Sequence, residues 1–395
     1  MAKVLLTWEG GAYLGHQIKV TAAAAVLHAA GHEIVIVAPQ GTPPNEAALR
    51  LKLRWTYLPA GLAPDGLSGP GLAWKSRATT LWEFGFQSED VVRERFHAWD
   101  AVLHREQPDV AFLQAAPFAQ ITAHVAQLPS VEFGIGFDVP PARQPFPAFR
   151  APEAFEVAEA LQLEQQMMAT MARVLGAAAR GRALHEMVAA PVRLVTSIHE
   201  LDHYDGHEDP TRRFVGPLPT LEMTDVRPAW HRSGKSGLRV LAYVRANLLH
   251  MTAFQKALAA LRGDCVVVCP DAAPEHVEQA RKLKLRLHLQ PVSLGGLLPQ
   301  ADLVISHAGG LMGEALVLGR ICVAMPTHFE QFMTAMTLRR RRLGVVVNPM
   351  EPASYEAALR HALGDVELRR NVAALGVRYR GAELKAAQAV VGACR

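Results

Sequence analysis

Cysteine is scarce in this sequence. The 395 residues include only four cysteines, and all four lie in the last third of the chain: Cys265, Cys269, Cys322 and Cys394. So few and so unevenly placed, they do not form a disulfide framework. We therefore expect free thiols in a reducing compartment.

Long hydrophobic runs are also missing. No stretch approaches the roughly 18 uninterrupted apolar residues of a membrane-spanning helix. The first residues form one short apolar run followed by Glu9-Gly10-Gly11, which differs from a secretory signal. We expect a cytoplasmic protein without an integral membrane segment, and peripheral membrane contact stays open.

Strong charge of one sign is absent as well. Forty-one Lys and Arg face 37 Asp and Glu, a net charge of +4. This excess is too mild to indicate a nucleic acid partner. Half of the residues are hydrophobic, which excludes disorder, and the length exceeds what one core usually supports. We therefore predict two domains.

The chain alternates between strand and helix patterns. An apolar run at 4–6, a helical pattern over 17–30 and a β-branched run at 33–38 form a βαβ unit, which implies a parallel sheet. A long helix is predicted over 152–187. A fresh strand begins at 238, after a segment rich in proline and glycine. The predicted parts are 1–215, a linker at 216–236, a second domain at 237–377 and a final helix at 378–395 that returns to the first domain.

One strand-to-helix turn carries the clearest chemistry. The strand 302–306 ends in His307-Ala-Gly309-Gly310, and a helix follows directly. Glycines let the backbone approach a ligand, and a helix N-terminus favours phosphate. His307 can donate to the same oxygens, and Glu314, two turns later, can accept from a ribose diol. These residues predict a nucleoside diphosphate site at the carboxyl edge of a parallel sheet.

Around this turn the sequence resembles family 1 glycosyltransferases of the GT-B fold, a group that includes macrolide, plant secondary-metabolite and glucuronosyl transferases. The matching motifs are, in order, Gly15-His16, Phe214-Val-Gly-Pro-Leu, Leu298-Pro299, His307-Ala-Gly-Gly, Glu314-Ala-Leu, Gly319, Pro326 and Glu330-Gln331. The resemblance is strong over 289–348 and thin over 40–190. It implies an α/β protein in which two Rossmann-like, doubly wound parallel-sheet domains face a central cleft.

The resemblance also implies roles for single residues. The second domain would bind a UDP- or dTDP-sugar: His307, Gly309 and Gly310 at the diphosphate, Glu314 at the ribose, the backbone at Val292 at the base, and Glu330 and Gln331 at the sugar. In the first domain, His16 would take the acceptor's proton, for which its ordinary pKa is suited. The transfer would invert the anomeric centre and would need no metal ion or other cofactor.

Three departures from the family stand out. Glu314 follows His307 by seven positions instead of eight, with no hydroxyl between them, so phosphate binding would rest on backbone amides or on Arg245. Gln114 takes the place of the acid that usually orients the catalytic histidine; Glu9 or Asp138 would then serve instead. The aromatic residue that usually stacks on the donor base is not evident next to Gln290.

The acceptor is less well defined. The segment 134–150 is dense in proline and phenylalanine, and Phe137, Phe146 and Trp82 are candidates for an acceptor pocket, with core packing as an equal alternative. The sequence does not choose between a small apolar or polyketide-like molecule, a lipid and a growing glycan. Nor does it choose between a monomer and a homodimer.

Other functions compete with sugar transfer. A sugar-nucleotide epimerase and a non-catalytic nucleotide-sugar-binding protein fit the same fold. His199-Glu200-Leu-Asp202-His203 matches the H-E-x-x-H signature of zinc hydrolases, which requires a helix. Because the motif follows a β-rich run and precedes Gly206, we expect a loop there and no metal site.

Overall fold

The computed structural model describes residues 1–10, 14–58, 74–149, 156–204, 206–231, 237–249 and 251–394. The chain divides into two units. The first comprises Met1–Ser197, Asp202–Leu218 and Leu384–Arg395; the second comprises Ile198–Leu201 and Pro219–Glu383. Residues 232–236 of the predicted linker, residues 152–155 of the predicted long helix and residue 150 of the proline-rich segment lie outside the described residues.

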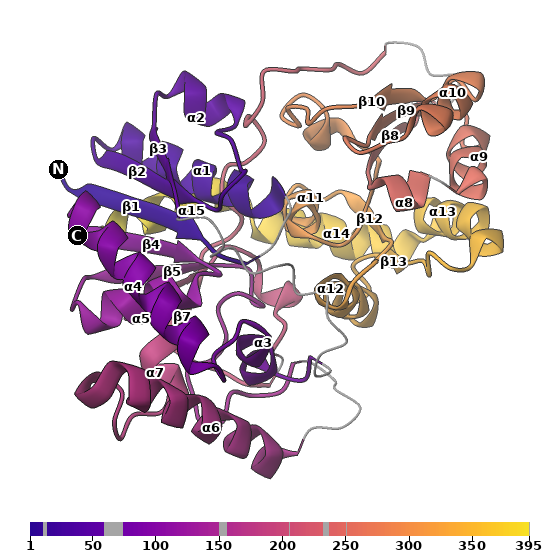
Figure 1. The fold of residues 1–395 in the computed structure, drawn as a ribbon. Helices are drawn as coiled ribbons and strands as arrows, with labels where there is room; N and C mark the ends of the chain where they lie inside the picture. The colour runs from indigo at the N-terminus through magenta and orange to yellow at the C-terminus, as the bar shows by residue number, and fades with distance from the viewer. Residues whose placement is uncertain are drawn as a thin grey trace. The chain divides into compact units, whose positions relative to one another are not determined.

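The first unit contains a seven-stranded parallel sheet in the order β3-β2-β1-β4-β5-β6-β7 (Figure 1). Its strands are β1 (Lys3–Trp8), β2 (Glu33–Ala38), β3 (Arg54–Tyr57), β4 (Val110–Gln114), β5 (Ser130–Gly134), β6 (Val192–Val195) and β7 (Arg212–Phe214). The order reverses between β1 and β4. Ligands of open α/β sheets bind outside the carboxyl ends of the strands at such a point.

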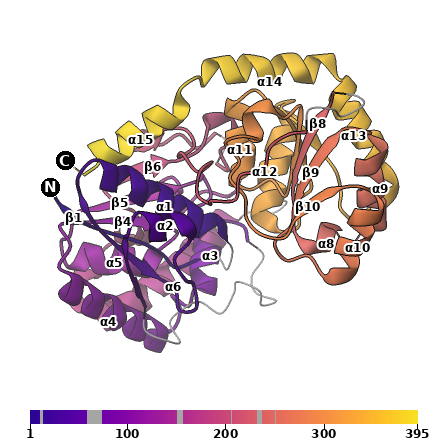
Figure 2. The same cartoon turned by 90° about the horizontal axis from the view of Figure 1, so that it is seen from above.

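Helices cover both faces of this sheet, because the crossovers on either side of the reversal run in opposite directions. Figure 2 shows α1 on one side and α4 and α5 on the other. The helices are α1 (Leu14–Ala29), α2 (Glu46–Arg50), α3 (Arg77–Glu83), α4 (Glu89–Glu106), α5 (Pro117–Val125), α6 (Val157–Leu175), α7 (Leu184–Val188) and α15 (Ala382–Gly392), of which the last begins in the second unit. A 3-10 turn, η1, spans Gly176–Ala178. Trp99, Phe118 and Met171 are buried in the core between the sheet and α4 to α7.

The second unit contains a six-stranded parallel sheet in the order β10-β9-β8-β11-β12-β13. Its strands are β8 (Arg239–Tyr243), β9 (Asp264–Val268), β10 (Arg286–His288), β11 (Leu303–Ser306), β12 (Ile321–Ala324) and β13 (Val345–Val346). Here the order reverses between β8 and β11. The carboxyl ends of these two neighbouring strands are therefore the expected ligand edge.

The helices of the second unit are α8 (Ala246–Leu249), α9 (Thr252–Ala260), α10 (Pro274–Lys282), α11 (Gly310–Val317), α12 (Phe329–Arg340), α13 (Tyr355–Gly364) and α14 (Val366–Arg378). Its 3-10 turns are η2 (His199–Leu201), η3 (Leu298–Gln300) and η4 (Pro352–Ser354). In both cartoons α14 lies beside α11 (Figures 1 and 2). A Cβ added at Gly376 would lie 2.8 Å from the Cα of Gly319, so glycine is required where the C-terminal end of α14 passes the turn after α11.

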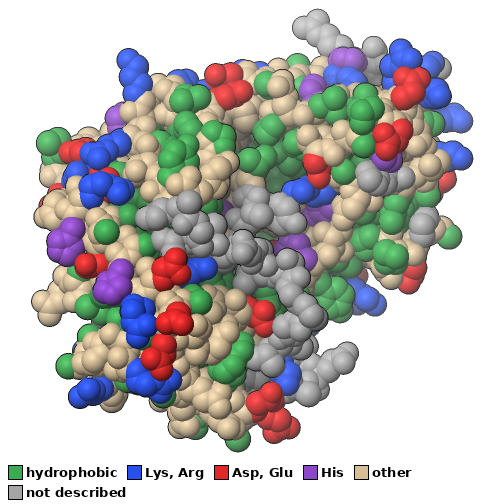
Figure 3. Space-filling model, viewed as in Figure 1, with side chains coloured by type: hydrophobic (Ala, Val, Ile, Leu, Met, Phe, Trp, Pro, Cys, Tyr) green, Lys and Arg blue, Asp and Glu red, His purple; other side chains and the backbone are tan. Residues whose placement is uncertain are grey.

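The surface and the thiols agree with the sequence. Basic and acidic side chains are interspersed on the face drawn in Figure 3, without a large field of one sign. Among the described residues no helix has the length and apolarity to span a bilayer. All four cysteines are free, as predicted, and three of them (Cys265, Cys269 and Cys322) are buried.

Candidate active site

The turn between β11 and α11 leaves backbone donors open. Helix α11 begins at Gly310, and its N-cap, Gly309, provides no side-chain cap. Within the described part of the chain, the N–H groups of Gly309, Gly310 and Leu311 have no hydrogen-bond partner. A Cβ added at Gly309 would meet no atom within 4 Å, so the space beside it is open. Such a helix start binds anions through its N–H groups and its dipole.

Ala308 gives this turn its shape. Its φ is 69°, in the left-handed region that alanine rarely adopts, and its side chain is fully buried. Its N–H donates to the hydroxyl of Ser306 over 3.3 Å. A strained residue of this kind persists only where its surroundings hold it, and such residues cluster at functional sites.

His307 is held by the backbone on both sides of its ring. Its Nε2 accepts from the N–H of Arg245 over 2.8 Å, and its Nδ1 lies 3.1 Å from the carbonyl oxygen of Met325. Because an amide N–H can only donate and a carbonyl can only accept, the ring is neutral with its proton on Nδ1. Burial lowers the pKa of His307 to about 4. Through these two hydrogen bonds the ring joins the ends of β8, β11 and β12. Its contact with phosphate stays a prediction.

Arg245 lies directly after Val244 at the end of β8, next to the turn after β11. Its Nε donates to Asp271 over 2.8 Å, and the other oxygen of Asp271 accepts from the N–H of Ala246 over 3.0 Å. Nearly half of the Arg245 side chain is exposed. Asp271 therefore orients a partly exposed guanidinium at the end of β8, the strand next to β11.

The other predicted donor-site residues belong to the same unit. Glu314 is buried on α11 and accepts from the hydroxyl of Thr220 over 2.6 Å. Glu330 and Gln331 lie in the first turn of α12, where the Gln331 carbonyl accepts from Thr327. The N–H and C=O of Val292 have no partner among the described residues, although its side chain is buried. Its predicted contact with the donor base stays a prediction.

In the first unit, His16 belongs to a chain of three polar side chains. His16 lies in the first turn of α1, and its Nδ1 is 2.7 Å from Oε1 of Gln114, the last residue of β4. The amide nitrogen of Gln114 donates to Asp138 over 2.9 Å. Asp138 also accepts from the N–H of Ile135 over 3.1 Å. The predicted base thus lies at the ligand edge of its sheet and is linked to a carboxylate through an amide.

Glu9, the other acid considered for orienting His16, has a different position. Its two oxygens accept from the N–H groups of Phe118 and Ala119, each over 2.9 Å, at the start of α5. Burial raises its pKa to about 7. Glu9 therefore caps a helix, whereas Asp138 is connected to His16.

The candidate acceptor residues are spread between a loop and the core. Phe137 stacks on Phe149 with ring centroids 4.8 Å apart and lies 5.8 Å from Trp74. Phe146 is fully buried in the hydrophobic core, and Trp82 packs against that core. The Phe137 ring thus belongs to an aromatic cluster of the proline-rich segment.

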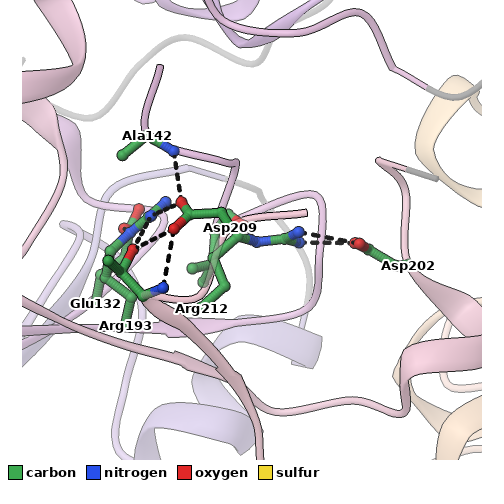
Figure 4. Close-up of polar contacts among 8 residues, drawn as sticks. Glu132, Ala142, Arg193, Asp202, Asp209 and Arg212 are labelled. Atoms are coloured by element: carbon green, nitrogen blue, oxygen red, sulfur yellow. Dashed lines mark hydrogen bonds and ion pairs between the residues drawn. The ribbon is translucent and has the colours of Figure 1, made fainter. Parts of the chain in front are cut away.

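An ion network that the sequence analysis did not identify anchors this segment (Figure 4). Buried Arg193 pairs with Glu132 and Asp209, and buried Arg212 pairs with Asp202. Asp209 also accepts from the N–H of Ala142 over 2.8 Å, and Arg212 donates to the Val139 carbonyl over 2.8 Å. The sequence signal is a charged residue inside each of two mostly apolar strand patterns, Glu132 in β5 and Arg193 in β6, whereas β7 is Arg-Arg-Phe and carries no such signal.

The H-E-x-x-H match does not form a zinc helix. His199, Glu200 and Leu201 form a single 3-10 turn, and Glu200 accepts from Arg378 over 2.7 Å and from Tyr379 over 2.6 Å. Among the described residues no group of three or more His, Cys, Asp or Glu side chains could hold a metal ion. The motif is a structural contact to the end of α14.

Comparison with known proteins identifies the fold. The sequence matches no protein-family model and no curated protein. The solved structures that resemble the chain include three at 17% identity: CalG4, the calicheamicin glycosyltransferase, with a TM-score of 0.68 over 100% of this chain and 98% of that one; VinC in complex with dTDP, at 0.68 over 99% of both; and the spinosyn rhamnosyltransferase SpnG, at 0.63 over 96% of both. This likeness confirms the predicted α/β fold with two parallel sheets, which is the GT-B fold of these glycosyltransferases.

Proposed function

We propose that this protein is an inverting glycosyltransferase that moves a sugar from a UDP- or dTDP-sugar to a hydroxyl of a small-molecule, lipid or glycan acceptor. One observation carries the proposal: three N–H groups at the start of α11 are open, at the carboxyl end of β11 where the strand order reverses. That is where a nucleoside diphosphate fits an open α/β sheet. Arg245 lies beside it with a partly exposed guanidinium.

The solved relatives support this choice of donor and acceptor. VinC was solved with dTDP, and SpnG with thymidine diphosphate and with spinosyn aglycone. Within the proposal, a dTDP-sugar and a polyketide-like acceptor are therefore the first compounds to test. A UDP-sugar is the alternative donor.

The proposed reaction assigns roles to His16, to the start of α11 and to Arg245. His16 takes the proton of the acceptor hydroxyl while that oxygen bonds to the anomeric carbon of the sugar. The bond from this carbon to the diphosphate oxygen breaks, and the nucleoside diphosphate leaves from the opposite face, so the centre inverts. The N–H groups of α11 and the Arg245 guanidinium stabilise the charge on the leaving group. The proposal includes no metal ion or other cofactor.

A substitution at Gly309 tests the donor site separately from folding. Gly309 has extended backbone angles at the N-cap, and its Cβ would meet no atom within 4 Å. In Gly309→Asp the carboxylate caps α11 and occupies its N–H groups. We expect unchanged or greater stability and a roughly tenfold or larger loss of affinity for dTDP and UDP. Gly309→Ala, which leaves the N–H groups open, is the matched control and should bind nearly as the parent does.

Release of nucleoside diphosphate from dTDP- and UDP-sugars tests the reaction. With a panel of hydroxyl-bearing acceptors, including polyketide aglycones, turnover should fall by roughly 100-fold or more in His16→Ala. Turnover that is equal in the variant would disprove the assignment of His16. Interconversion of the sugar without an acceptor would indicate the epimerase, and saturable binding without any turnover would indicate a non-catalytic binding protein.

A further inference from the structure

We propose that Gln114 and Asp138 are positioning residues for His16, and that Asp138 acts on the base through the amide of Gln114 instead of touching it. This inference rests on the proposed function of His16. It is carried by a continuous chain of hydrogen bonds in the first unit: His16 to Gln114 at 2.7 Å, Gln114 to Asp138 at 2.9 Å, and Ile135 to Asp138 at 3.1 Å.

The chemistry of the partners fixes every proton in this chain. A carboxylate only accepts, so the Gln114 group that faces Asp138 is the NH₂. The carbonyl of Gln114 then faces His16 and also only accepts, so Nδ1 of His16 carries the proton. In that tautomer Nε2 holds the lone pair and is the nitrogen that takes the acceptor's proton. Asp138 thus selects the tautomer of a residue that it does not contact.

The fold holds each member of the chain in place. Gln114 is fully buried and pairs with Trp8 at the end of two central strands, β4 and β1. Asp138 closes a tight turn: its N–H bonds to the carbonyl of Ile135, and a Cβ at Gly134, whose φ is 153°, would lie 2.5 Å from its carboxylate. Only glycine at 134 allows the carboxylate to reach Gln114.

The ion network of Figure 4 fixes the chain segment that follows Asp138. Arg212 holds the carbonyl of Val139, and Asp209 holds the N–H of Ala142. Asp202 and Arg193 complete the pairs and are buried as well. The network therefore restrains the loop that carries Asp138, without itself touching His16 in any contact shown.

We call the hydrogen-bonded chain His16–Gln114–Asp138 the amide relay. It differs in a measurable way from a carboxylate that is hydrogen-bonded directly to the histidine. A carboxylate hydrogen-bonded to Nδ1 would stabilise the imidazolium and raise the pKa of the base, whereas a neutral carbonyl does so less. Charged groups around the relay include Glu132 on β5, which interacts with Asp138, and Arg193 on β6 and Arg77 at the start of α3, which interact with Glu132. Substitutions that leave these three residues unchanged therefore report on the relay.

Moving the carboxylate from position 138 to position 114 tests the relay. Asp138→Asn keeps the shape but removes the charge that orients the Gln114 amide; turnover should fall by roughly tenfold or more, with donor KM changed less than about twofold. Gln114→Glu combined with Asp138→Asn moves the carboxylate next to His16. The new amide at position 138 can donate to that carboxylate once it gives up the bond from the Ile135 N–H, because one oxygen of Asp138 accepts both bonds in the parent. The double variant should recover most of the turnover, and the acidic limb of its kcat/KM profile should move up by about one pH unit. A purely structural role for Asp138 would not produce the rescue of turnover.

Nitrogen NMR of His16 separates this inference from the proposed function. The parent protein should show the Nδ1–H tautomer and Asp138→Asn a mixture of tautomers, whether or not a glycosyl acceptor is found. A parent ring protonated on Nε2, or a tautomer unaffected by Asp138→Asn, would overturn the relay. If the tautomer follows Asp138 but no variant or parent releases nucleoside diphosphate, the relay stands and the proposed function fails.

Discussion

The backbone N–H of Arg245 donates to Nε2 of His307 across 2.8 Å and joins the ends of β8 and β11. These strands are neighbours where the strand order of the second unit reverses. The bond makes His307 a fixed, neutral part of the turn that leads to Gly309. From the sequence, His307 is predicted to donate a hydrogen bond to phosphate. The structure adds a second reason for a histidine at this position, because its ring connects two strand ends without any ligand.

His307 should remain neutral at all ordinary pH values. Burial lowers its pKa to about 4, below its usual value of 6.5. Proton NMR should therefore show its ring signal unchanged between about pH 5.5 and about pH 8. His307→Ala assigns that signal and should reduce dTDP affinity by roughly tenfold, because the loop at Arg245 loses its tie. His288→Ala, on the edge strand β10, is the control; a midpoint of His307 near 6.5 would contradict the buried tautomer.

The lowered pKa of His307 also makes the stability of the folded protein depend on pH. Because the folded pKa of His307 lies below the unfolded value, its contribution to stability is present above about pH 6.5 and is lost as pH falls through about 4.

The contribution of Glu164 on α6 to stability depends on pH in the opposite direction. Burial raises its pKa from 4.5 to about 7, with one oxygen bonded to the N–H of Phe146 and the other without a partner among the described residues.

Glu164 should stabilise the first unit in acid and lose that effect near neutral pH. Its contribution is complete below about pH 4.5 and disappears as pH rises through about 7. The difference in unfolding free energy between the parent and Glu164→Gln should shrink by an amount on the order of 3 kcal/mol between about pH 5 and about pH 8. Urea unfolding measures it, with Glu159→Gln on the exposed face of α6 as the control. A difference that does not depend on pH would refute the buried carboxyl.

Sequence patterns predict the elements near the nucleotide site well. The apolar runs and glycine signals of 302–319 are local, and the structure contains β11, the glycine turn and α11 there. The helix predicted over 152–187 is divided instead. Helix α6 ends at Leu175, Gly176 follows with a φ of 61°, and α7 begins only at Leu184. The buried face of α7 does not continue that of α6, and the sequence signal of the break is the pair Gly176 and Gly181, both with a positive φ.

Contacts between distant residues are what the sequence could not supply. Glu132 and Arg193 are 61 positions apart and become partners only because β5 and β6 are neighbours in register. The relay from Asp138 to His16 also depends on contacts between residues that are distant in the sequence. Gln114 could be placed at a strand end from its pattern, but its link to Asp138 depends on the tight turn at Gly134. Strand order and loop closure, not local propensity, determine both.

The thiols should react unequally. Burial raises the pKa of all four thiols, to about 12 each for Cys265, Cys269 and Cys322, and Cys394 is the one that is partly exposed to a reagent. Because thiolates are the reactive species, a disulfide reagent should label only Cys394 quickly in the native protein and all four cysteines in urea. Cys394→Ser should remove the fast phase. Fast labelling of two or more thiols in the native protein would show that the strands of the second sheet are more accessible than the structure indicates.

We expect Glu200 to contribute to the stability of the second unit and to have no role at a metal site. Its carboxylate accepts from both Arg378 and Tyr379 at the C-terminal end of α14, and burial together with this carboxylate raises the pKa of the tyrosine. Glu200→Gln can still accept one hydrogen bond but loses the ion pair, and the unfolding free energy of the second unit should fall by about 1–3 kcal/mol. Metal analysis of the purified parent protein should find no stoichiometric zinc, and a chelator should leave dTDP affinity unchanged. Bound zinc that disappears in His199→Ala and in His203→Ala would restore the hydrolase interpretation, because the two histidines are the metal ligands of that motif.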